Sequence, residues 1–169
     1  MSRLHRRLLA VAGAAVAALS LTVTGSTAAS ASPAWARESG TEYIQLASTS
    51  ATSPTESAIV YGLFTDYGVD YPGNTVDKIV LQKGSFKVAH SQGTGPQYFN
   101  PKTCLTIIDE HGTYRIYHGT GKYRGIRGSG TYHFTLKLIA ARVKGQCSQS
   151  QPPVVYQLII DASGPVSLP

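Results

Sequence analysis

Alternating apolar and polar side chains are the clearest pattern in this chain, and the pattern is strongest in residues 130–143. Along this stretch one face is apolar and the other is polar, as expected for a β-strand with one buried face. The apolar face carries Tyr132, Phe134, Leu136, Leu138 and Ala140, and the polar face carries Thr131, His133, Thr135 and Lys137. Residues 84–91 and 112–118 alternate similarly, and the sequence shows no amphipathic helical stretch of useful length. The pattern therefore predicts an all-β protein.

Eight segments rich in Val, Ile, Tyr, Phe and Thr fit short strands between turn residues. They are residues 41–47, 57–65, 76–83, 84–91, 103–109, 112–118, 130–143 and 153–162. Turn sequences at residues 71–74 (YPGN) and 110–112 (EHG) separate several of them. Short links favour a single eight-stranded antiparallel up-and-down barrel, which removes exposed edges and can hold side chains or one small ligand. A two-sheet sandwich is the alternative that the pattern leaves open.

The first 31 residues have the composition of a secretory signal peptide. A basic leader (residues 3–7) precedes an apolar run (residues 8–23), and small residues lead to an A-x-A site. The run of about 16 residues is shorter than the ~20 that a membrane-spanning helix needs. We expect cleavage after Ala31, with Ala36 as the alternative, and a secreted product. The chain then divides into residues 1–31, the signal peptide, residues 32–40, a flexible segment, and residues 41–169, the barrel domain.

The charge balance argues against nucleic acid as the partner. Fifteen Lys and Arg against nine Asp and Glu give a formal charge of +6, and removal of the three signal-peptide arginines lowers it to +3. The sequence also lacks the dense run of basic and aromatic residues that a nucleic-acid track needs. No other segment is long and apolar enough to span a membrane, so we expect no membrane association after signal cleavage.

The two cysteines, Cys104 and Cys147, are predicted to form a disulfide, because an even count outside the cytoplasm favours oxidation. A zinc site is the rival interpretation. Zinc needs three or four ligands at motif spacing, and the sequence has neither C-x-x-C nor H-x-x-x-H. Closing a loop of about 40 residues should stabilise the fold by roughly 4 kcal/mol in the chain-entropy model.

Residues 119–130 (GTGKYRGIRGSG) are rich in glycine and contain GTGK, which looks like part of a phosphate loop. A phosphate loop requires G-x-x-x-x-G-K-[ST] between a strand and a helix. Here Tyr123 follows Lys122, and Ile116 stands five positions before Gly121. We therefore predict that the glycines serve backbone curvature, in a long twisted connection that covers one end of the barrel.

The segment GTGKYRGIRGSGTY is similar to the GGTGKF-x-GARG-type segment of the plant allene oxide cyclase and dirigent proteins. It resembles more closely a branch of small exported proteins of high-GC Gram-positive bacteria, described as allene oxide cyclase barrel-like. This resemblance covers about residues 57–168, and it implies an eight-stranded antiparallel barrel, often oligomeric in the plant members. It implies no activity and no catalytic residue, and it leaves room for a homo-oligomer. Further matching segments are residues 62–66 (GLFTD), 84–88 (GSFKV) with His90, 99–104 (FNPKTC), Cys147 and 164–166 (GPV).

The candidate ligand-binding residues, at the barrel lumen or its rim, are Tyr61, His90, Tyr114, His118 and Tyr132. His90 and His118 share strand parity with apolar neighbours, and tyrosine offers amphipathic contacts at low entropy cost. We found no nucleophile, cofactor or metal motif in the sequence, so we expect no catalytic residue, no cofactor and no metal ion.

Three other polar features are assigned to exposed positions. Residues 66–70 (DYGVD) are predicted to form a solvated acidic turn, with a weak calcium site as the alternative. His111 is assigned to a turn, and His133 to the polar face of its strand.

Two functions remain in view. The first is a non-catalytic secreted barrel that binds a small apolar ligand or a partner surface. The second is a cyclase- or dirigent-type enzyme that steers ring closure or coupling of a reactive unsaturated molecule inside a shaped lumen. We favour the first, because the sequence shows no convergent acid–base set.

Overall fold

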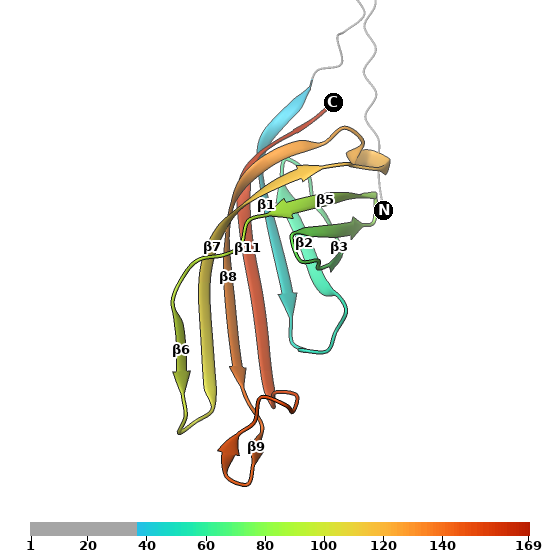
Figure 1. Ribbon diagram of the computed structural model, residues 1–169. Helices are drawn as coiled ribbons and strands as arrows, with labels where there is room; N and C mark the ends of the chain where they lie inside the picture. The colour runs from blue at the N-terminus through green and yellow to red at the C-terminus, as the bar shows by residue number, and fades with distance from the viewer. Residues whose placement is uncertain (1–36) are drawn as a thin grey trace, which may run out of the picture. The chain divides into compact units, whose positions relative to one another are not determined.

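In the computed structural model, which describes residues 37–169, eight antiparallel strands hydrogen-bond into a closed ring (Figure 1). In order around the ring they are β1 (Glu38–Ser48), β2 (Glu56–Gly62), β3 (Asp66–Tyr71), β4 (Val76–Leu81), β5 (Gly84–His90), β7 (Leu105–Tyr117), β8 (Arg127–Ile139) and β11 (Val155–Leu168). The pairing of β5 with β7 closes the ring, and β11 pairs with β1. The predicted barrel is therefore confirmed, and the sandwich is excluded.

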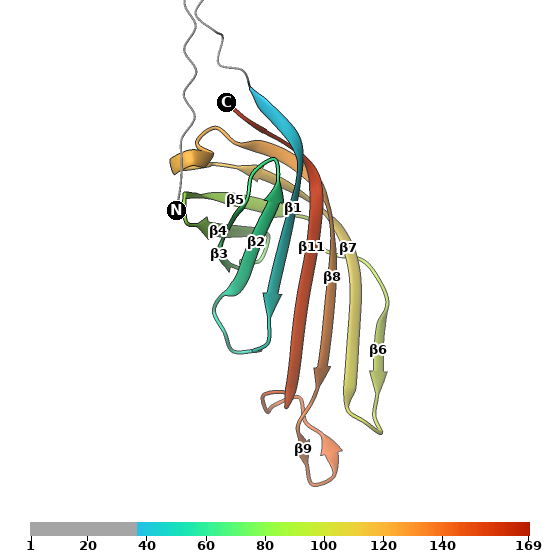
Figure 2. The same ribbon diagram turned by 180° about the vertical axis from the view of Figure 1, so that it is seen from behind.

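Strands β7, β8 and β11 continue past one end of the ring, as Figures 1 and 2 show. Strand β6 (Gln97–Asn100) pairs with the extended part of β7. A small hairpin of β9 (Arg142–Val143) and β10 (Gln146–Cys147) follows β8. The 3₁₀ helix η1 (Gly121–Tyr123) lies at the opposite end, between β7 and β8.

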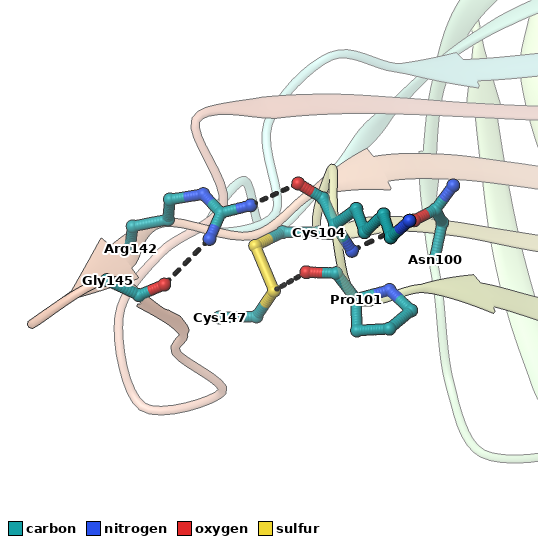
Figure 3. The surroundings of a disulfide bond; sticks show 7 residues. Asn100, Pro101, Cys104, Arg142, Gly145 and Cys147 are labelled. Atoms are coloured by element: carbon teal, nitrogen blue, oxygen red, sulfur yellow. Dashed lines mark hydrogen bonds between the residues drawn. A yellow bond between two sulfur atoms is a disulfide. The ribbon is translucent and has the colours of Figure 1, made fainter.

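The predicted disulfide between Cys104 and Cys147 is present (Figure 3), with the two Cα atoms 5.4 Å apart. It joins the β6–β7 turn to the β9–β10 hairpin. Around it, Arg142 donates hydrogen bonds to the carbonyl oxygens of Gly145 (2.7 Å) and Lys102. The bridge therefore fastens the hairpin to the extension of the barrel, away from the ring.

Side chains at alternate positions of the barrel strands point inward and form the core. This core contains Ile44, Leu46, Ala58, Val60, Ile79, Leu81, Phe86, Val88, Tyr114, Ile116, Tyr123, Ile126 and Val166. Full burial of one aliphatic or aromatic side chain stabilises a fold by roughly 1.5–3 kcal/mol. Because side chains alternate between the two faces of a strand, burial of this apolar set fixes which face of each strand meets the lumen.

The connection between β7 and β8 closes one end of the barrel. Its side chains Tyr123 and Ile126 are buried in the core. The Tyr123 ring packs on Phe64 and Phe86, with ring centroids 4.8 and 5.7 Å away. A Cβ atom at Gly119 would lie 1.7 Å from the Tyr123 carbonyl oxygen, so this turn requires a glycine. The glycines of this connection allow the close backbone approach that brings Tyr123 over the lumen.

Strand β3 occupies residues 66–71, where the sequence predicted a solvated acidic turn. Asp66 and Asp70 face the interior and are buried, whereas Tyr67 and Tyr71 are exposed. The turn prediction is therefore wrong. Two side chains four residues apart on one strand are separated by about 13 Å, which is too far for both carboxylates to bind one calcium ion.

Strand β7 runs unbroken through residues 110–112, where the sequence predicted a turn. The two predicted strands 103–109 and 112–118 are one strand, and His111 is a strand residue. The total of eight barrel strands holds because β3 replaces the strand lost by this merger. Strands β8 and β11 have different bounds from the predicted 130–143 and 153–162, and β2 ends at Gly62 instead of residue 65. Strands β6, β9 and β10 were not predicted.

The predicted signal peptide and both cleavage positions lie outside the described residues. Strand β1 begins at Glu38, within the segment predicted to be flexible, and Glu38 pairs with Leu168 of β11. Over residues 37–169, no helix has the length and apolar character needed to cross a membrane.

Candidate functional site

The barrel interior opens into a cavity of about 480 Å³ at the end away from η1. Its walls are largely apolar and come from β1, β4, β5, β8 and β11. The apolar lining includes Ile44, Leu46, Ile79, Val88, Phe134, Ile160 and Ala162. A cavity of this size is in the range of small-molecule sites.

Acidic side chains also line this cavity. The carboxylates that line it are Glu56, Asp70, Asp77 and Glu110. Among its lining residues, all within the described chain, there is no lysine or arginine, and His90 is the one basic side chain. The cavity therefore combines an apolar body with a negative end.

Asp70 is the most buried of these carboxylates, with 1 % of its surface exposed. It lies on the inner face of β3, directly opposite Glu56 of β2 in the strand register. Among the residues that the structure describes, neither of its carboxylate oxygens has a hydrogen-bond partner. Burial, with added repulsion from Asp77 and Glu56, raises the pKa of Asp70 to about 8, and the nearby Tyr71 backbone N–H offsets part of this without forming a hydrogen bond of normal geometry.

Glu56 is a second carboxyl group with a raised pKa. Its Oε2 atom is buried without a partner. Burial, with a contribution from the negative charge of Asp77, raises the pKa of Glu56 above its ordinary value. Two neighbouring carboxyl groups on β2 and β3 therefore both have a pKa above the ordinary value.

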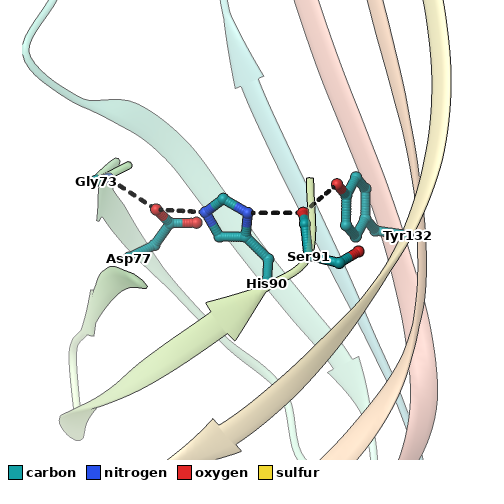
Figure 4. A network of polar contacts seen from close by, with 5 residues as sticks. All are labelled: Gly73, Asp77, His90, Ser91 and Tyr132. Atoms are coloured by element: carbon teal, nitrogen blue, oxygen red, sulfur yellow. Dashed lines mark hydrogen bonds and ion pairs between the residues drawn. The ribbon is translucent and has the colours of Figure 1, made fainter. Parts of the chain in front are cut away.

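His90 is held by a network of polar contacts at the rim (Figure 4). Its Nε2 atom lies 3.4 Å from Oδ1 of Asp77, and its Nδ1 atom lies 3.2 Å from the carbonyl oxygen of Ser91. The backbone N–H of Gly73 also donates to Asp77 Oδ1, at 2.8 Å. Both ring nitrogens therefore face oxygen atoms. His90 is thereby fixed in orientation by the strand ends around it.

Two tyrosines complete the polar part of the cavity. Tyr114 is 5 % exposed, and its hydroxyl has no hydrogen-bond partner within residues 37–169. Burial, with a contribution from the charge of Glu42, raises the pKa of Tyr114 to about 12, so the hydroxyl remains a donor. The Tyr132 hydroxyl instead donates to the carbonyl oxygen of Ser91 at 2.8 Å.

Three of the five residues named from the sequence, His90, Tyr114 and Tyr132, line this one cavity. The other two lie elsewhere. Tyr61 is 48 % exposed on the outer face of β2, where its ring stacks on Tyr43 with centroids 5.1 Å apart. The cavity is therefore lined by His90 of β5, Tyr114 of β7 and Tyr132 of β8, whereas Tyr61 of β2 points outward.

His118 is an exposed residue that directly follows β7. It lines a shallow outer groove of about 870 Å³, together with Arg115 and Arg127. This groove is basic and open, whereas the lumen cavity is acidic and more enclosed. His118 and His90 thus belong to different surfaces of the barrel.

Sequence reasoning missed the carboxylates Glu56, Asp70 and Asp77 as members of the site. The signal was available in β3, since Asp66, Gly68 and Asp70 share one parity and the bulky residues share the other. Carboxylates are seldom buried without a partner, so the pattern was assigned to solvent.

Comparison with protein-family models, with curated proteins and with solved structures found no match for this chain.

Proposed function

We propose that the barrel binds, in its lumen, a small molecule with an apolar body and a hydrogen-bond-donating end, preferably a protonated amine. The observation that carries this proposal is Asp70: a buried carboxyl group, without a partner among the described residues, that lines a largely apolar cavity. The proposed ligand therefore differs from the small apolar ligand expected from the sequence by having a polar end.

The energetics of burial support a ligand at Asp70. A buried polar group without a hydrogen bond costs a fold about 1–3 kcal/mol, and a charged one costs more. A ligand that donates to the Asp70 oxygens would recover this cost on binding. Its apolar body would gain about 25 cal/mol for each Å² removed from water against residues such as Ile44 and Val88.

The charges around the cavity favour a cation over a neutral donor. Four carboxyl groups line the cavity against one histidine, so the field on a positive ligand becomes more favourable, and the repulsion of an anion stronger, as Asp70 and Glu56 lose their protons. A cation beside Asp70 also favours the ionised carboxylate. Binding of an amine should therefore release a proton from the protein below about pH 8.

The test is isothermal titration calorimetry with three aliphatic or aryl-alkyl series of matched size, namely amines, alcohols and carboxylates. We expect one site per barrel, with affinity in the order amine, alcohol, carboxylate. Affinity for the amine should rise between about pH 6 and about pH 9 as Asp70 loses its proton. The other ionisable side chains that face this cavity, apart from its tyrosines, are Glu56, Asp77, Glu110 and His90.

The matched variants are Asp70→Asn in the lumen and Asp161→Asn on the outer face of β11. Asp70→Asn should abolish the preference for the amine over the alcohol, and Asp161→Asn should keep it. Absence of binding in all three series, or an amine preference that survives Asp70→Asn, would reject the proposal.

A second candidate function is supported by the protonated state of Asp70. With a pKa of about 8 it holds a proton at neutral pH inside a cavity that also contains the Tyr114 hydroxyl. A cyclase- or dirigent-type protein could use such an acid while the lumen holds one conformer of a reactive unsaturated molecule. Chiral analysis of the product tests this: wild-type protein should give an enantiomeric excess that Asp70→Asn removes, and a racemic product with wild-type protein would reject it.

We infer that the chain is exported through cleavage of residues 1–31, and that it belongs to the allene oxide cyclase barrel-like branch. The eight-stranded barrel and the disulfide support this inference, since both fit an exported protein of that kind. Edman sequencing of protein recovered from the medium should begin at Ser32, or at Arg37 for the alternative site. A homo-oligomer remains a prediction, and light scattering in solution would test it.

A further inference from the structure

Two histidines and one aspartate converge on the outer surface of the barrel, away from the lumen cavity. Asp109 and His111 lie on β7, and His133 lies directly opposite His111 on β8. The neighbouring inward residues, Tyr114 and Tyr132, line the lumen, so the opposite parity places these three side chains on the outer face. They form the group that we call the His–His–Asp cluster.

The donor atoms of this cluster lie close together. Nε2 of His133 lies 2.9 Å from Oδ1 of Asp109, and Nε2 of His111 lies 3.6 Å from the same oxygen. The two imidazole rings stack with centroids 4.3 Å apart and an angle of 9° between their planes. All three donor atoms lie within 4.8 Å of one another.

The two separations from Asp109 are close to an edge of a small coordination polyhedron. Zinc binds histidine nitrogen and carboxylate oxygen at about 2.0–2.2 Å, which places two ligands of a tetrahedral ion about 3.3 Å apart. The two separations from Asp109 lie on either side of that value. The two stacked rings would turn about their side-chain bonds so that both Nε2 atoms face one ion.

The strands hold the cluster on a rigid frame. The backbone of His111 exchanges hydrogen bonds with Thr94 on one side, at 2.9 and 3.0 Å. On the other side β7 pairs with β8 without a break from Leu105 to Ile116. Metal sites need ligands held on such fixed elements, because loose ligands lose conformational entropy on binding.

We propose that the His–His–Asp cluster binds a divalent transition-metal ion of the zinc class, with three protein ligands and the remaining position open to water. Imidazole nitrogen and carboxylate oxygen are the donors that such ions take in sites with an open position. Asp161 lies opposite His133 on β11 and adds negative charge beside the cluster, while its own Oδ1 accepts a hydrogen bond from Gln45. This proposal differs from the expectation, made from the sequence, that the chain holds no metal ion.

The test is titration of tag-free protein with Zn²⁺ alone, followed by calorimetry, and with Co²⁺, followed by visible absorption. We expect one ion per chain and the intense visible bands of a four-coordinate cobalt site. His111→Gln and His133→Gln should each weaken binding by about tenfold or more, which corresponds to at least ~1.4 kcal/mol, and the double variant should lose it.

The control is His118→Asn, which changes an exposed histidine elsewhere on the barrel. Its backbone has φ 53°, a region that asparagine tolerates well, so this variant should fold and keep full zinc affinity. Circular dichroism checks that every variant is folded. Absence of zinc binding by the wild-type protein, or binding that persists unchanged in the double variant, would overturn the proposal.

Discussion

Asp66 and Asp70 lie four residues apart on the inner face of β3 and are both buried, yet their hydrogen bonding differs. Asp66 accepts hydrogen bonds from the Tyr123 hydroxyl at 2.6 Å and from the backbone N–H groups of Tyr67 and Lys83 at 2.9 and 3.0 Å. Burial raises the pKa of Asp66, but these donors outweigh it, and the pKa lies below its ordinary value. Asp70 has no such donors, and its pKa moves the other way.

Tyr123→Phe tests the bond at the closed end of the barrel. Removal of the hydroxyl takes a donor from a buried carboxylate, and bonds to charged groups are worth about 1.5–3 kcal/mol. We expect the free energy of unfolding, measured in urea, to fall by this amount. Tyr98→Phe, on the exposed strand β6, should change it little. Equal stability of Tyr123→Phe and wild type would show that the bond does not hold this end closed.

The lumen carboxyl groups predict a fold that is more stable in mild acid. Asp70 has a folded pKa of about 8 against 3.8, and buried Glu42 one of about 7 against 4.5. The folded state therefore binds more protons than the unfolded state between about pH 4 and pH 8. Stability is highest below this window and falls as pH rises through it, by at most ~1.4 kcal/mol per pH unit for each group.

Asp70→Asn removes one of these groups, because an amide does not titrate. The variant should show a shallower loss of stability from about pH 5 to pH 8, and it should exceed wild type in stability near pH 8. Thermal melts at several pH values measure both effects. A variant that follows the wild-type profile throughout would mean that Asp70 is hydrated or paired in solution.

At the scale of single strands, β7 depends on a contact between Gly112 and Tyr132 of β8. These residues are directly opposite in the register, and a Cβ atom at Gly112 would lie 2.4 Å from the Tyr132 ring. The ring covers the glycine and reaches the Ser91 carbonyl with its hydroxyl. A glycine that indicates a turn in the sequence is therefore a site of cross-strand packing.

Gly112→Ala should displace the Tyr132 ring and destabilise the protein by about 1–3 kcal/mol, as overpacking usually does. Gly40→Ala in β1 is the matched control, since its Cβ would meet Leu63 at an ordinary 3.4 Å. Chemical denaturation compares the two. If both variants are equally stable, the ring does not rest on Gly112.

The disulfide acts on the extension of β7 and β8 rather than on the ring. Replacing Cys104 and Cys147, 43 residues apart, with alanine should lower stability by roughly 4 kcal/mol in the chain-entropy model. Hydrogen exchange should accelerate first in β6 and in the β9–β10 hairpin. In the wild-type protein the two cysteines should not react with a thiol label until reductant is added. Immediate labelling would contradict the bridge.

Strands were predictable from the sequence wherever apolar side chains face the core, as in β5 and β8. Strand β3 was not, because its inward residues are Asp66, Gly68 and Asp70 while its tyrosines face solvent. This exchange of the usual inward apolar and outward polar positions also explains why only part of the site was predicted. His90, Tyr114 and Tyr132 follow the parity of apolar neighbours, whereas the partnerless Asp70 becomes visible only once the barrel closes around it.

The barrel as a whole has one closed and one open end. Tyr123 and Ile126 fill the end near η1, and the opposite end leads into the acidic cavity. The His–His–Asp cluster lies on the outer wall, so a ligand in the lumen and an ion on the surface would bind independently. A small molecule must then enter past His90 and Asp77, and its apolar part must reach Ala162.

The most direct test of this account compares Ala162→Leu with Ser163→Leu by calorimetry with the tightest-binding amine. These neighbours on β11 have opposite parity: Ala162 lines the cavity, whereas Ser163 is not among its lining residues. If the lumen is the binding site, Ala162→Leu fills it and should weaken binding by tenfold or more, about 1.4 kcal/mol, while Ser163→Leu should bind as wild type does. Full affinity in a folded Ala162→Leu variant would show that the ligand binds somewhere other than the lumen.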